Sequence, residues 1–249
     1  MDFSGIQIAL LLMAFLAGAF VKGLSGIGMP LFVIPILLQF VPLQTAIAIM
    51  MVPAFFSNIF QLFDYRKVHD ATQRFWPLLI VLPIGISIGN LALLYLYPRQ
   101  LDVLIGLLIG AFACFGLLRV APVTSNLNEK WWNPIVGAIT GILGGFSSFY
   151  GPPIAFYLLM LKLPRDVFIV TSALIFTVAG GVLNTLMIVH GLVGWHDVLL
   201  SIASLVPVSA GLFLGNHVRR YISQGLFDRI VLWFLFIIAL NQIRRGLGW

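Results

Sequence analysis

The sequence is poor in charged residues. Only 9% of its 249 residues are Asp, Glu, Lys or Arg, against roughly 25% in a soluble globular domain. Hydrophobic residues make up 61%, and the mean hydropathy is +1.07. Uncharged runs of 41, 31 and 30 residues lie between Lys22 and Asp64, Lys130 and Lys162, and Asp166 and Asp197. Each run exceeds the roughly 20 residues that cross a bilayer as a helix. This composition excludes a soluble domain and predicts an all-α polytopic membrane protein.

Acidic residues are scarce, and none is expected in the middle of a membrane segment. The eight fall in predicted loops or at helix ends: Asp2, Asp64, Asp70, Asp102, Glu129, Asp166, Asp197 and Asp228. The histidines also lie near loops, and no H-E-x-x-H, Walker or paired-carboxylate pattern is present. We therefore expect no catalytic residues, no metal and no cofactor. A proton relay through a mid-membrane carboxylate is likewise not expected.

Cysteine and targeting features are nearly absent. The single Cys114 cannot form an intramolecular disulfide, and its apolar surroundings indicate a packing role. The N-terminal residues lack a basic region and an A-x-A cleavage site, which predicts a retained membrane segment. The net charge is +6, but the basic residues sort to loops and report topology. No nucleic-acid partner is expected.

What the sequence does contain is two apolar segments broken by small residues and proline. Residues 18–42 read GAFVKGLSGIGMPLFVIPILLQFVP, and residues 141–164 read GILGGFSSFYGPPIAFYLLMLKLP. Irregular backbone in hydrocarbon leaves amides unpaired, at several kcal/mol each, unless it is buried in protein or lines a cavity. Broken apolar segments at matching places in two halves indicate the binding site of a transporter.

The two halves share landmarks in the same order. Four positions recur after 123 residues, pairing Gly18 with Gly141, Ser25 with Ser148, Gly28 with Gly151 and Pro30 with Pro153. Each half is expected to hold a broken pair and three further helices. The predicted helices are 6–21, 30–40, 43–63, 75–96 and 101–118, then 132–150, 152–161, 167–189, 198–215 and 226–243. The sequence thus predicts a membrane repeat over residues 1–120, a cytoplasmic linker over 121–131 and a second membrane repeat over 132–249.

Basic residues favour an inverted relation between the repeats. With the predicted loop 64–74 in the cytoplasm and each broken pair returning to its own side, ten Lys or Arg residues are cytoplasmic. Three are external: Arg99, Arg244 and Arg245. A single crossing per broken pair would give seven against six. The positive-inside rule therefore predicts two inverted repeats with both termini outside. Arms of about 15 residues, roughly 23 Å long, fall short of a hydrocarbon core of roughly 30 Å, which indicates re-entrant half-helices or short protected spans.

The two turns supply most candidate substrate-binding residues. A helix that begins at proline presents its positive dipole end and its free amides to an anion. Serine and tyrosine hydroxyls nearby could donate to the oxygens of such an anion. Tight helix packing through small residues is the competing interpretation. The candidates in the turns are Ser25, Gly26, Gly28, Pro30, Ser147, Ser148, Tyr150, Gly151, Pro152 and Pro153.

Three further candidates lie within the membrane segments. Lys22 is the one Lys or Arg expected deep in a segment, where a charge is costly and functional by default. Its ammonium could instead snorkel to the cytoplasmic surface, and the sequence favours neither interpretation. Its expected partner at a shift of 123 is Gly145, so we expect an asymmetric site. Asn58 and Asn184 follow the breaks at comparable distances, with interhelical hydrogen bonding as the alternative.

The broken segments also resemble a known family. GAFVKGLSGIGMPLFVIPILL and GAITGILGGFSSFYGPPIAFYLL are similar to the two signature segments of the TauE/SafE family of sulfite and organosulfonate exporters. VTSALIFTVAGGVLNTLMIVHGLVGW resembles the segment that follows in that family's second half. The likeness covers nearly the whole chain. Met29-Pro30 and Phe149-Tyr150 depart from the glycine-rich pattern that family members often show.

The resulting hypothesis is a secondary membrane transporter of a small sulfur-containing anion, sulfite or an organosulfonate. The resemblance implies export and a bacterial plasma membrane location; the residues themselves do not show direction. A membrane scaffold or assembly factor without transport activity is the alternative. The expected partners are the anionic substrate and the lipid bilayer, and the sequence is compatible with a homodimer.

Overall fold

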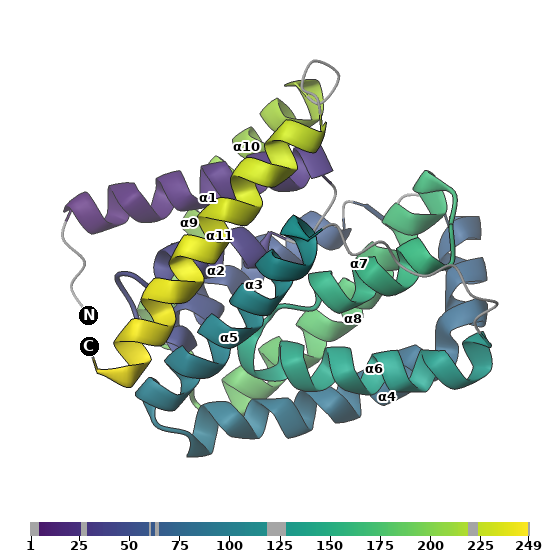
Figure 1. Cartoon of the computed structure of the whole chain (residues 1–249), viewed down its shortest axis with the longest axis horizontal. Coiled ribbons are helices and arrows are strands. Elements are labelled where there is room, and N and C mark those ends of the chain that lie inside the picture. The colour runs from purple at the N-terminus through teal and green to yellow at the C-terminus, as the bar shows by residue number, and fades with distance from the viewer. Residues whose placement is uncertain are drawn as a thin grey trace. The chain divides into compact units, whose positions relative to one another are not determined.

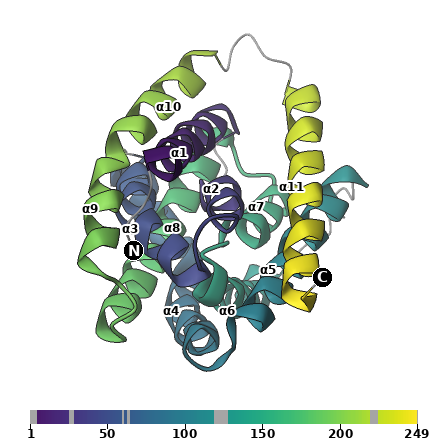
Figure 2. The same ribbon diagram turned by 90° about the vertical axis from the view of Figure 1, so that its left-hand side faces the viewer.

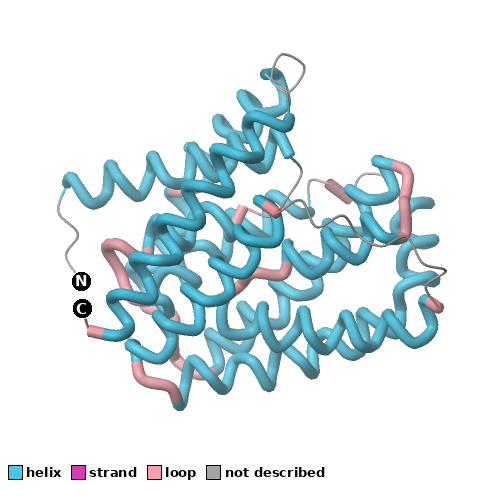
Figure 3. The backbone as a smooth tube through the Cα atoms, in the orientation of Figure 1, coloured by secondary structure: helices cyan, strands magenta, loops and turns pink. Residues whose placement is uncertain are grey.

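The structure is a computed structural model, and every regular element in its described part is an α-helix (Figure 3). The residues described are 5–25, 29–59, 61–62, 65–118, 128–218 and 224–248. This confirms the predicted all-α fold class. The relation of the two halves as inverted repeats stays a prediction.

The order of helices follows the predicted plan closely. Within the described residues, the first half holds α1 (Gly5–Ser25), α2 (Pro30–Leu37), α3 (Leu43–Ile59), α4 (Tyr65–Tyr95) and α5 (Pro98–Leu117). The second half holds α6 (Glu129–Ser147), α7 (Gly151–Met160), α8 (Arg165–Val189), α9 (Trp195–Ala203), α10 (Leu205–Val218) and α11 (Gln224–Leu247). Both broken segments therefore contain one helix followed by a second helix that begins at or beside proline.

Several helices are suited to cross a bilayer. Among the described residues, four helical stretches are long and apolar enough: Arg66–Tyr95, Pro98–Leu117, Asp166–Val189 and Trp195–Val218. Shorter apolar helices cover Ile8–Leu24, Leu43–Ile59 and Gly151–Met160. The chain is a multi-pass membrane protein.

The arms of each broken pair differ in length, where the sequence led us to expect two of about 15 residues. In the first pair α1 has 21 residues and α2 has 8. In the second pair α6 has 19 and α7 has 10. At 1.5 Å per residue, α2 and α7 are roughly 12 and 15 Å long, about half of a hydrocarbon core. The break thus divides each segment into one long helix and one half-helix.

Two predicted boundaries were wrong, and proline accounts for the irregularities. The stretch predicted as the loop 64–74 is helical from Tyr65 and joins the rest of α4 through non-helical dihedral angles at Phe75. Pro77 follows two residues later, and proline disrupts the helical turn before it. The single helix predicted over 198–215 is instead α9 and α10, divided at Ser204. Pro207 lacks the N–H that would bond to Ala203, and its ring crowds that carbonyl.

The described chain packs as two compact units, each of which draws on both halves. Unit 1 comprises Met1–Met50, Tyr95–Ala121 and Val193–Trp249. Unit 2 comprises Met51–Leu94 and Pro122–Leu192. This division by packing differs from the predicted division by repeats, which stays a prediction.

In unit 1, α1 packs along α10 and α5 packs along α11, as Figures 1 and 2 both show. Glycines allow the close approach: a Cβ added to Gly106 of α5 would lie 3.0 Å from the Ala239 carbonyl oxygen of α11. The half-helix α2 contacts both α1 and α11. Arg245 of α11 donates to the carbonyl of Leu38 at the end of α2, and Asn241 donates to the Gln39 side chain at 2.6 Å. The C-terminal end of α2 is therefore held by α11.

In unit 2, α6 lies against α4 through three glycines spaced one turn apart. A Cβ added to Gly137, Gly141 or Gly145 would come within 2.4 to 2.8 Å of a carbonyl oxygen of α4. The backbones of the two helices are thus in direct contact. Helices α6, α7 and α8 contact one another in pairs, and α7 follows α6 through the turn at 148–150.

The close approaches in the two units correspond to one another. An added Cβ on Gly23 of α1 would meet backbone atoms of Leu212, Gly215 and Asn216. An added Cβ on Gly145 of α6 would meet the same backbone atoms of Ile86, Gly89 and Asn90. Positions in α1 thus correspond to positions 122 residues later in α6. Positions in α4, the partner of α6, correspond to positions 126 residues later in α10, the partner of α1. The shift of 123 expected from the sequence is one residue too long for α1 and α6, which end at Ser25 and Ser147.

Candidate functional site

The turn between α6 and α7 in unit 2 is buried and internally bonded. Ser148 takes the left-handed conformation, with φ of 61°, and its N–H donates to Gly144 O at 2.7 Å. The Ser147 hydroxyl donates to Leu143 O at 2.5 Å and accepts the Phe149 N–H at 3.0 Å. A serine hydroxyl has one proton to donate, so that of Ser147 is used within the turn. Ser147 ends the helix here, and Ser148 caps it.

Proline limits the backbone donors at the start of α7. Of residues 151–153, only Gly151 carries an N–H, because Pro152 and Pro153 have none. The N–H of Ile154 points to Tyr150 O at 3.4 Å. The end of α7 keeps its positive dipole, but it offers fewer amides to an anion than the proline signal led us to expect. Other donors are needed to bind an anion in this turn.

Tyr150 is the most polar large side chain of this turn. It is 5% exposed, and its Oη makes no hydrogen bond. The Ser148 side chain lies near the phenol. The Tyr150 ring covers Gly144: a Cβ added there would lie 2.0 and 2.1 Å from two ring carbons. Glycine at position 144 therefore makes room for the tyrosine.

The first turn is described in part. Gly26, Gly28 and the side chain of Ser25 lie outside the described residues. Pro30 is the first residue of α2, as predicted, and buried Met29 precedes it. Of the predicted turn, the structure thus places the two ends: the last residue of α1 and the first of α2.

Lys22 lies in the last turn of α1 and is 2% exposed. A cation near a helix C-terminus interacts favourably with the helix dipole. The shift of 122 makes Gly144 its counterpart in α6, rather than Gly145. Gly144 is the glycine that the Tyr150 ring covers. Where the first half has a lysine side chain on the helix, the second half has a glycine covered by tyrosine.

The two asparagine candidates differ in their surroundings. Asn58, near the end of α3, is buried, while Asn184 of α8 is half-buried. The shift of 122 pairs Asn58 with Gly180, not with Asn184. A Cβ added to Gly180 would lie 3.8 Å from the ring of Phe55, and one added to Gly181 would lie 3.7 Å from it. The two asparagines therefore do not occupy equivalent positions.

Sequence reasoning missed a polar network that links α4, α6 and α7. Arg74 donates twice to Glu129, at 2.6 and 2.8 Å. Asn133, one turn into α6, donates to the Arg74 carbonyl at 3.1 Å. The Tyr157 hydroxyl donates to Asn133 Oδ1 at 2.7 Å. This network anchors α7 midway along its length. The signal available in the sequence was Asn133, an amide inside an otherwise apolar run.

Asn90 of α4 is buried, and its Oδ1 lies 2.8 Å from Nδ1 of the exposed His190. Three buried hydroxyls of unit 2 were missed. Thr140, Thr171 and Ser172 are buried, and their hydroxyls make no hydrogen bond. In the sequence they stand in the uncharged runs GAITGIL and VTSALIF, and only Thr171 and Ser172 are adjacent to one another.

In the described part of the chain, no group of three or more His, Cys, Asp or Glu side chains could hold a metal ion. The family model described as Sulfite exporter TauE/SafE matches residues 10–241.

The chain belongs to the TauE/SafE family. The matched range contains both turns and every candidate residue from Lys22 to Asn184, which confirms the resemblance seen in the sequence. TauE/SafE membership places the chain in a family of membrane transporters. Comparison with curated proteins and with solved structures gives no match.

Proposed function

We propose that this TauE/SafE protein is a secondary transporter that exports a small sulfur-containing anion, sulfite or an organosulfonate, across the bacterial plasma membrane. The observation that carries the proposal is the family match over residues 10–241. The chemistry of the described residues agrees with it, because the buried Lys22 of α1 and the buried Ser148 and Tyr150 of the second turn are donors rather than carboxylates. Donors of this kind suit an anion.

We assign substrate contacts to the turns that precede α2 and α7. In unit 1 the buried Lys22 supplies positive charge at the end of α1. In unit 2 the dipole of α7 and the polar side chains of the turn supply partial charge. The assigned residues are the predicted ones: Lys22, Ser25, Gly26, Gly28, Pro30, Asn58, Ser147, Ser148, Tyr150, Gly151, Pro152, Pro153 and Asn184.

Flux through proteoliposomes tests the function. Purified full-length protein is reconstituted, loaded with radiolabelled sulfite or with a labelled organosulfonate, and efflux is followed against empty liposomes. We expect protein-dependent efflux of at least one of the two, with labelled acetate retained. Efflux no faster than from empty liposomes for both anions would overturn the proposal and leave a membrane scaffold as the better interpretation.

Two substitutions test the turns. A hydrogen bond from a charged donor contributes about 1.5–3 kcal/mol, so we expect Lys22→Met to weaken anion binding roughly 10- to 150-fold. Gly151 is buried at the start of α7, so Gly151→Leu should obstruct that turn. Calorimetry with sulfite or methanesulfonate measures both affinities, and circular dichroism verifies folding. Wild-type affinity in both folded variants would place the substrate elsewhere.

A further inference from the structure

Unit 2 contains buried hydroxyl groups that the protein itself leaves without a hydrogen-bond partner. They belong to Thr140, Tyr150, Thr171 and Ser172, which are 0%, 5%, 0% and 4% exposed. In the described part of unit 1, the one buried side-chain polar atom without a partner is Oε1 of Gln242, which is an acceptor. Unpaired buried donors are thus concentrated in the unit that contains α7.

The helix backbone could have satisfied these hydroxyls, and elsewhere it does. In α8, Thr177 donates to Ala173 O at 2.7 Å and Thr185 donates to Gly181 O at 2.8 Å. Thr171 and Ser172 of the same helix make no such bond. A buried hydroxyl that loses its water without a replacement is unfavourable. A buried hydroxyl that does not donate to the carbonyl oxygen one helical turn earlier keeps its proton available to donate to a bound ligand.

Thr140 and the ring of Tyr150 lie on one face of α6. Thr140 precedes Gly144 by four residues, which makes the two positions neighbours on the helix surface. The Tyr150 ring covers Gly144 within 2.1 Å of where a Cβ would be, so it lies one turn from Thr140. Helix α8, which carries Thr171 and Ser172, contacts both α6 and α7. Figure 1 shows these three helices together within unit 2.

The donors in this region are neutral. No Lys, Arg, Asp or Glu occurs between Lys130 and Lys162 or between Asp166 and Asp197, which covers all four hydroxyls. Pro152 and Pro153 also remove two amides from the start of α7. Side-chain hydroxyls are therefore the main hydrogen-bond donors available to a ligand here. Hydroxyl donors match an oxyanion that has several acceptor oxygens, and their lack of charge favours release as well as binding.

We propose that Thr140 and Tyr150, together with Thr171 and Ser172, form a hydroxyl-donor site in unit 2 for the oxygens of a sulfite or sulfonate group. This inference rests on the proposed function and deepens it. It adds three residues to the predicted set and gives Tyr150 a specific role, as a donor through Oη. The site discriminates a three-oxygen head group from a halide, because chloride can accept hydrogen bonds but cannot distribute them over three atoms.

The test removes single hydroxyls without changing side-chain shape. Thr140→Val and Tyr150→Phe are compared with Thr177→Val and Tyr157→Phe, whose hydroxyls bond within the protein. Binding of sodium sulfite and methanesulfonate to purified full-length protein is measured by calorimetry, with sodium chloride as the comparison. We expect dissociation constants raised about 2- to 10-fold in the first pair and unchanged in the second.

Thermal unfolding without anion gives an independent readout. Replacing an unpaired buried hydroxyl by an apolar group of the same shape is neutral or stabilising, whereas breaking a bond within the protein is destabilising. The first pair of variants should therefore match or exceed the wild-type Tm, and the second pair should fall below it. If Thr140→Val does not fold, Thr171→Val and Ser172→Ala repeat the test on α8.

Wild-type affinity for both anions in Thr140→Val and Tyr150→Phe would overturn the hydroxyl site while leaving the transport proposal intact. A lower Tm in these variants without anion would also overturn it, since it would show that the protein satisfies the hydroxyls itself. If the wild type bound neither anion and released neither from proteoliposomes, the proposed function would fall together with the site.

Discussion

Gly145 determines how closely α6 can approach α4. A Cβ at this position would lie 2.4 Å from the Ile86 carbonyl oxygen and 3.0 Å from Asn90 N. Both are backbone atoms, so neither can rotate away. By contrast, a Cβ on Gly181 would lie 3.7 Å from a ring carbon of Phe55, which is ordinary van der Waals contact. The two glycines therefore have different structural roles, although both lie within helices.

Gly145→Ala should lower the free energy of unfolding by roughly 1–3 kcal/mol, because the helices must separate to admit the methyl group. This corresponds to about 2–12 °C in Tm for a chain of this size. Gly181→Ala is the matched control, and its better helix propensity should leave Tm equal or slightly raised. Thermal unfolding in detergent measures both. Equal Tm values for the two variants would show that α4 and α6 are not in backbone contact.

The sequence predicted the residues of the turns but not the state of their hydroxyls. Ser147, Ser148 and Tyr150 were recognisable beside the Gly-Pro break. Thr171 and Thr177 look alike in the sequence, yet one hydroxyl bonds to the backbone and the other does not. That difference depends on the side-chain rotamer, which packing determines. Residue types can thus be predicted from local spacing, whereas their hydrogen-bonding roles need the tertiary structure.

At the scale of elements, ion pairs join the N-terminal ends of the helices of unit 2. Arg74 of α4 bonds to both carboxylate oxygens of Glu129 on α6, at 2.6 and 2.8 Å. Lys67 of α4 reaches Asp166 of α8 through a single contact of 3.4 Å, and the Asp166 side chain is 75% exposed. A bidentate pair is stronger and more directional than a single one. The first pair should therefore stabilise the fold more than the second.

Double-mutant cycles measure this difference. For Arg74→Gln and Glu129→Gln, we expect a coupling free energy near the upper end of about 0.2–1 kcal/mol, the range for partly exposed pairs. For Lys67→Gln and Asp166→Asn it should be close to zero. Both cycles use Tm in detergent, and raising the salt concentration should reduce the first coupling. A larger coupling for Lys67 and Asp166 would contradict the assigned geometry.

The elements themselves were largely predictable, because apolar length and proline are local signals. The two half-helices begin at or beside the expected prolines. The boundary error at α4 arose because a mostly polar stretch is helical where tertiary contacts support it, and the error at α9 arose because Pro207 divides the predicted helix at Ser204. The segment 65–74 is mostly polar, and its contacts with α6 and α8 come from residues about 55 and 99 positions away. No local pattern reports such partners.

At the scale of the whole molecule, the interleaving of the halves was the least predictable feature. Unit 1 joins α1 to α10, and unit 2 joins α4 to α6, so each broken helix packs against a helix from the other half. The order of the segments and their shared landmarks could be predicted from the sequence. Partners far apart in the chain are selected by surface shape, here by glycines at matching positions. The correspondence of these contacts supports the repeat, and the homodimer and the inverted orientation stay predictions.

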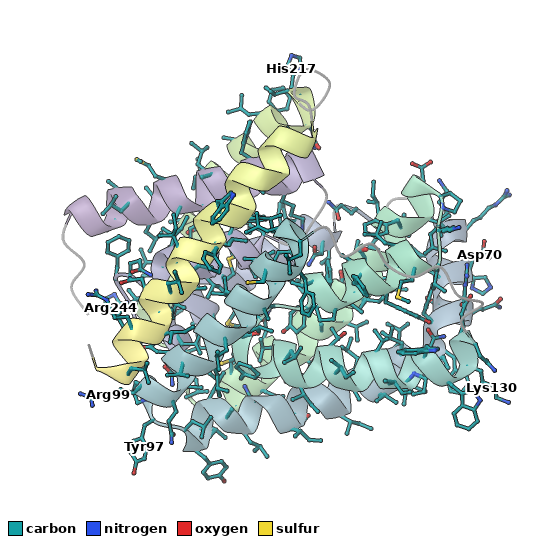
Figure 4. All side chains as sticks on the ribbon, viewed as in Figure 1. Asp70, Tyr97, Arg99, Lys130, His217 and Arg244 are labelled. Atoms are coloured by element: carbon teal, nitrogen blue, oxygen red, sulfur yellow. The ribbon has the colours of Figure 1, made fainter. Side chains whose placement is uncertain are left out.

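The charges of each unit are gathered by side, which makes the predicted topology testable. Figure 4 shows Tyr97, Arg99 and Arg244 at one end of unit 1, and a Cβ added to Gly246 would lie 2.8 Å from Arg99 O. Arg99, Arg244 and Arg245 are the basic residues that the positive-inside rule assigns to the outside. In unit 2, Figure 4 shows Asp70 and Lys130 at one end. Asp70 lies in the predicted cytoplasmic loop 64–74, and Lys130 lies in the predicted cytoplasmic linker 121–131.

Labelling of introduced cysteines decides the topology. Cys114 is exposed, so it is first replaced by serine, and Tyr97→Cys, Arg244→Cys and Asp70→Cys are then made singly. With a membrane-impermeant maleimide on intact cells, we expect labelling at positions 97 and 244, because both lie at the end predicted to be external. Position 70 should react only after the membrane is permeabilised. Protection of position 244 with labelling of position 70 would reverse the orientation, and different accessibility at 97 and 244 would exclude inverted repeats with both termini outside.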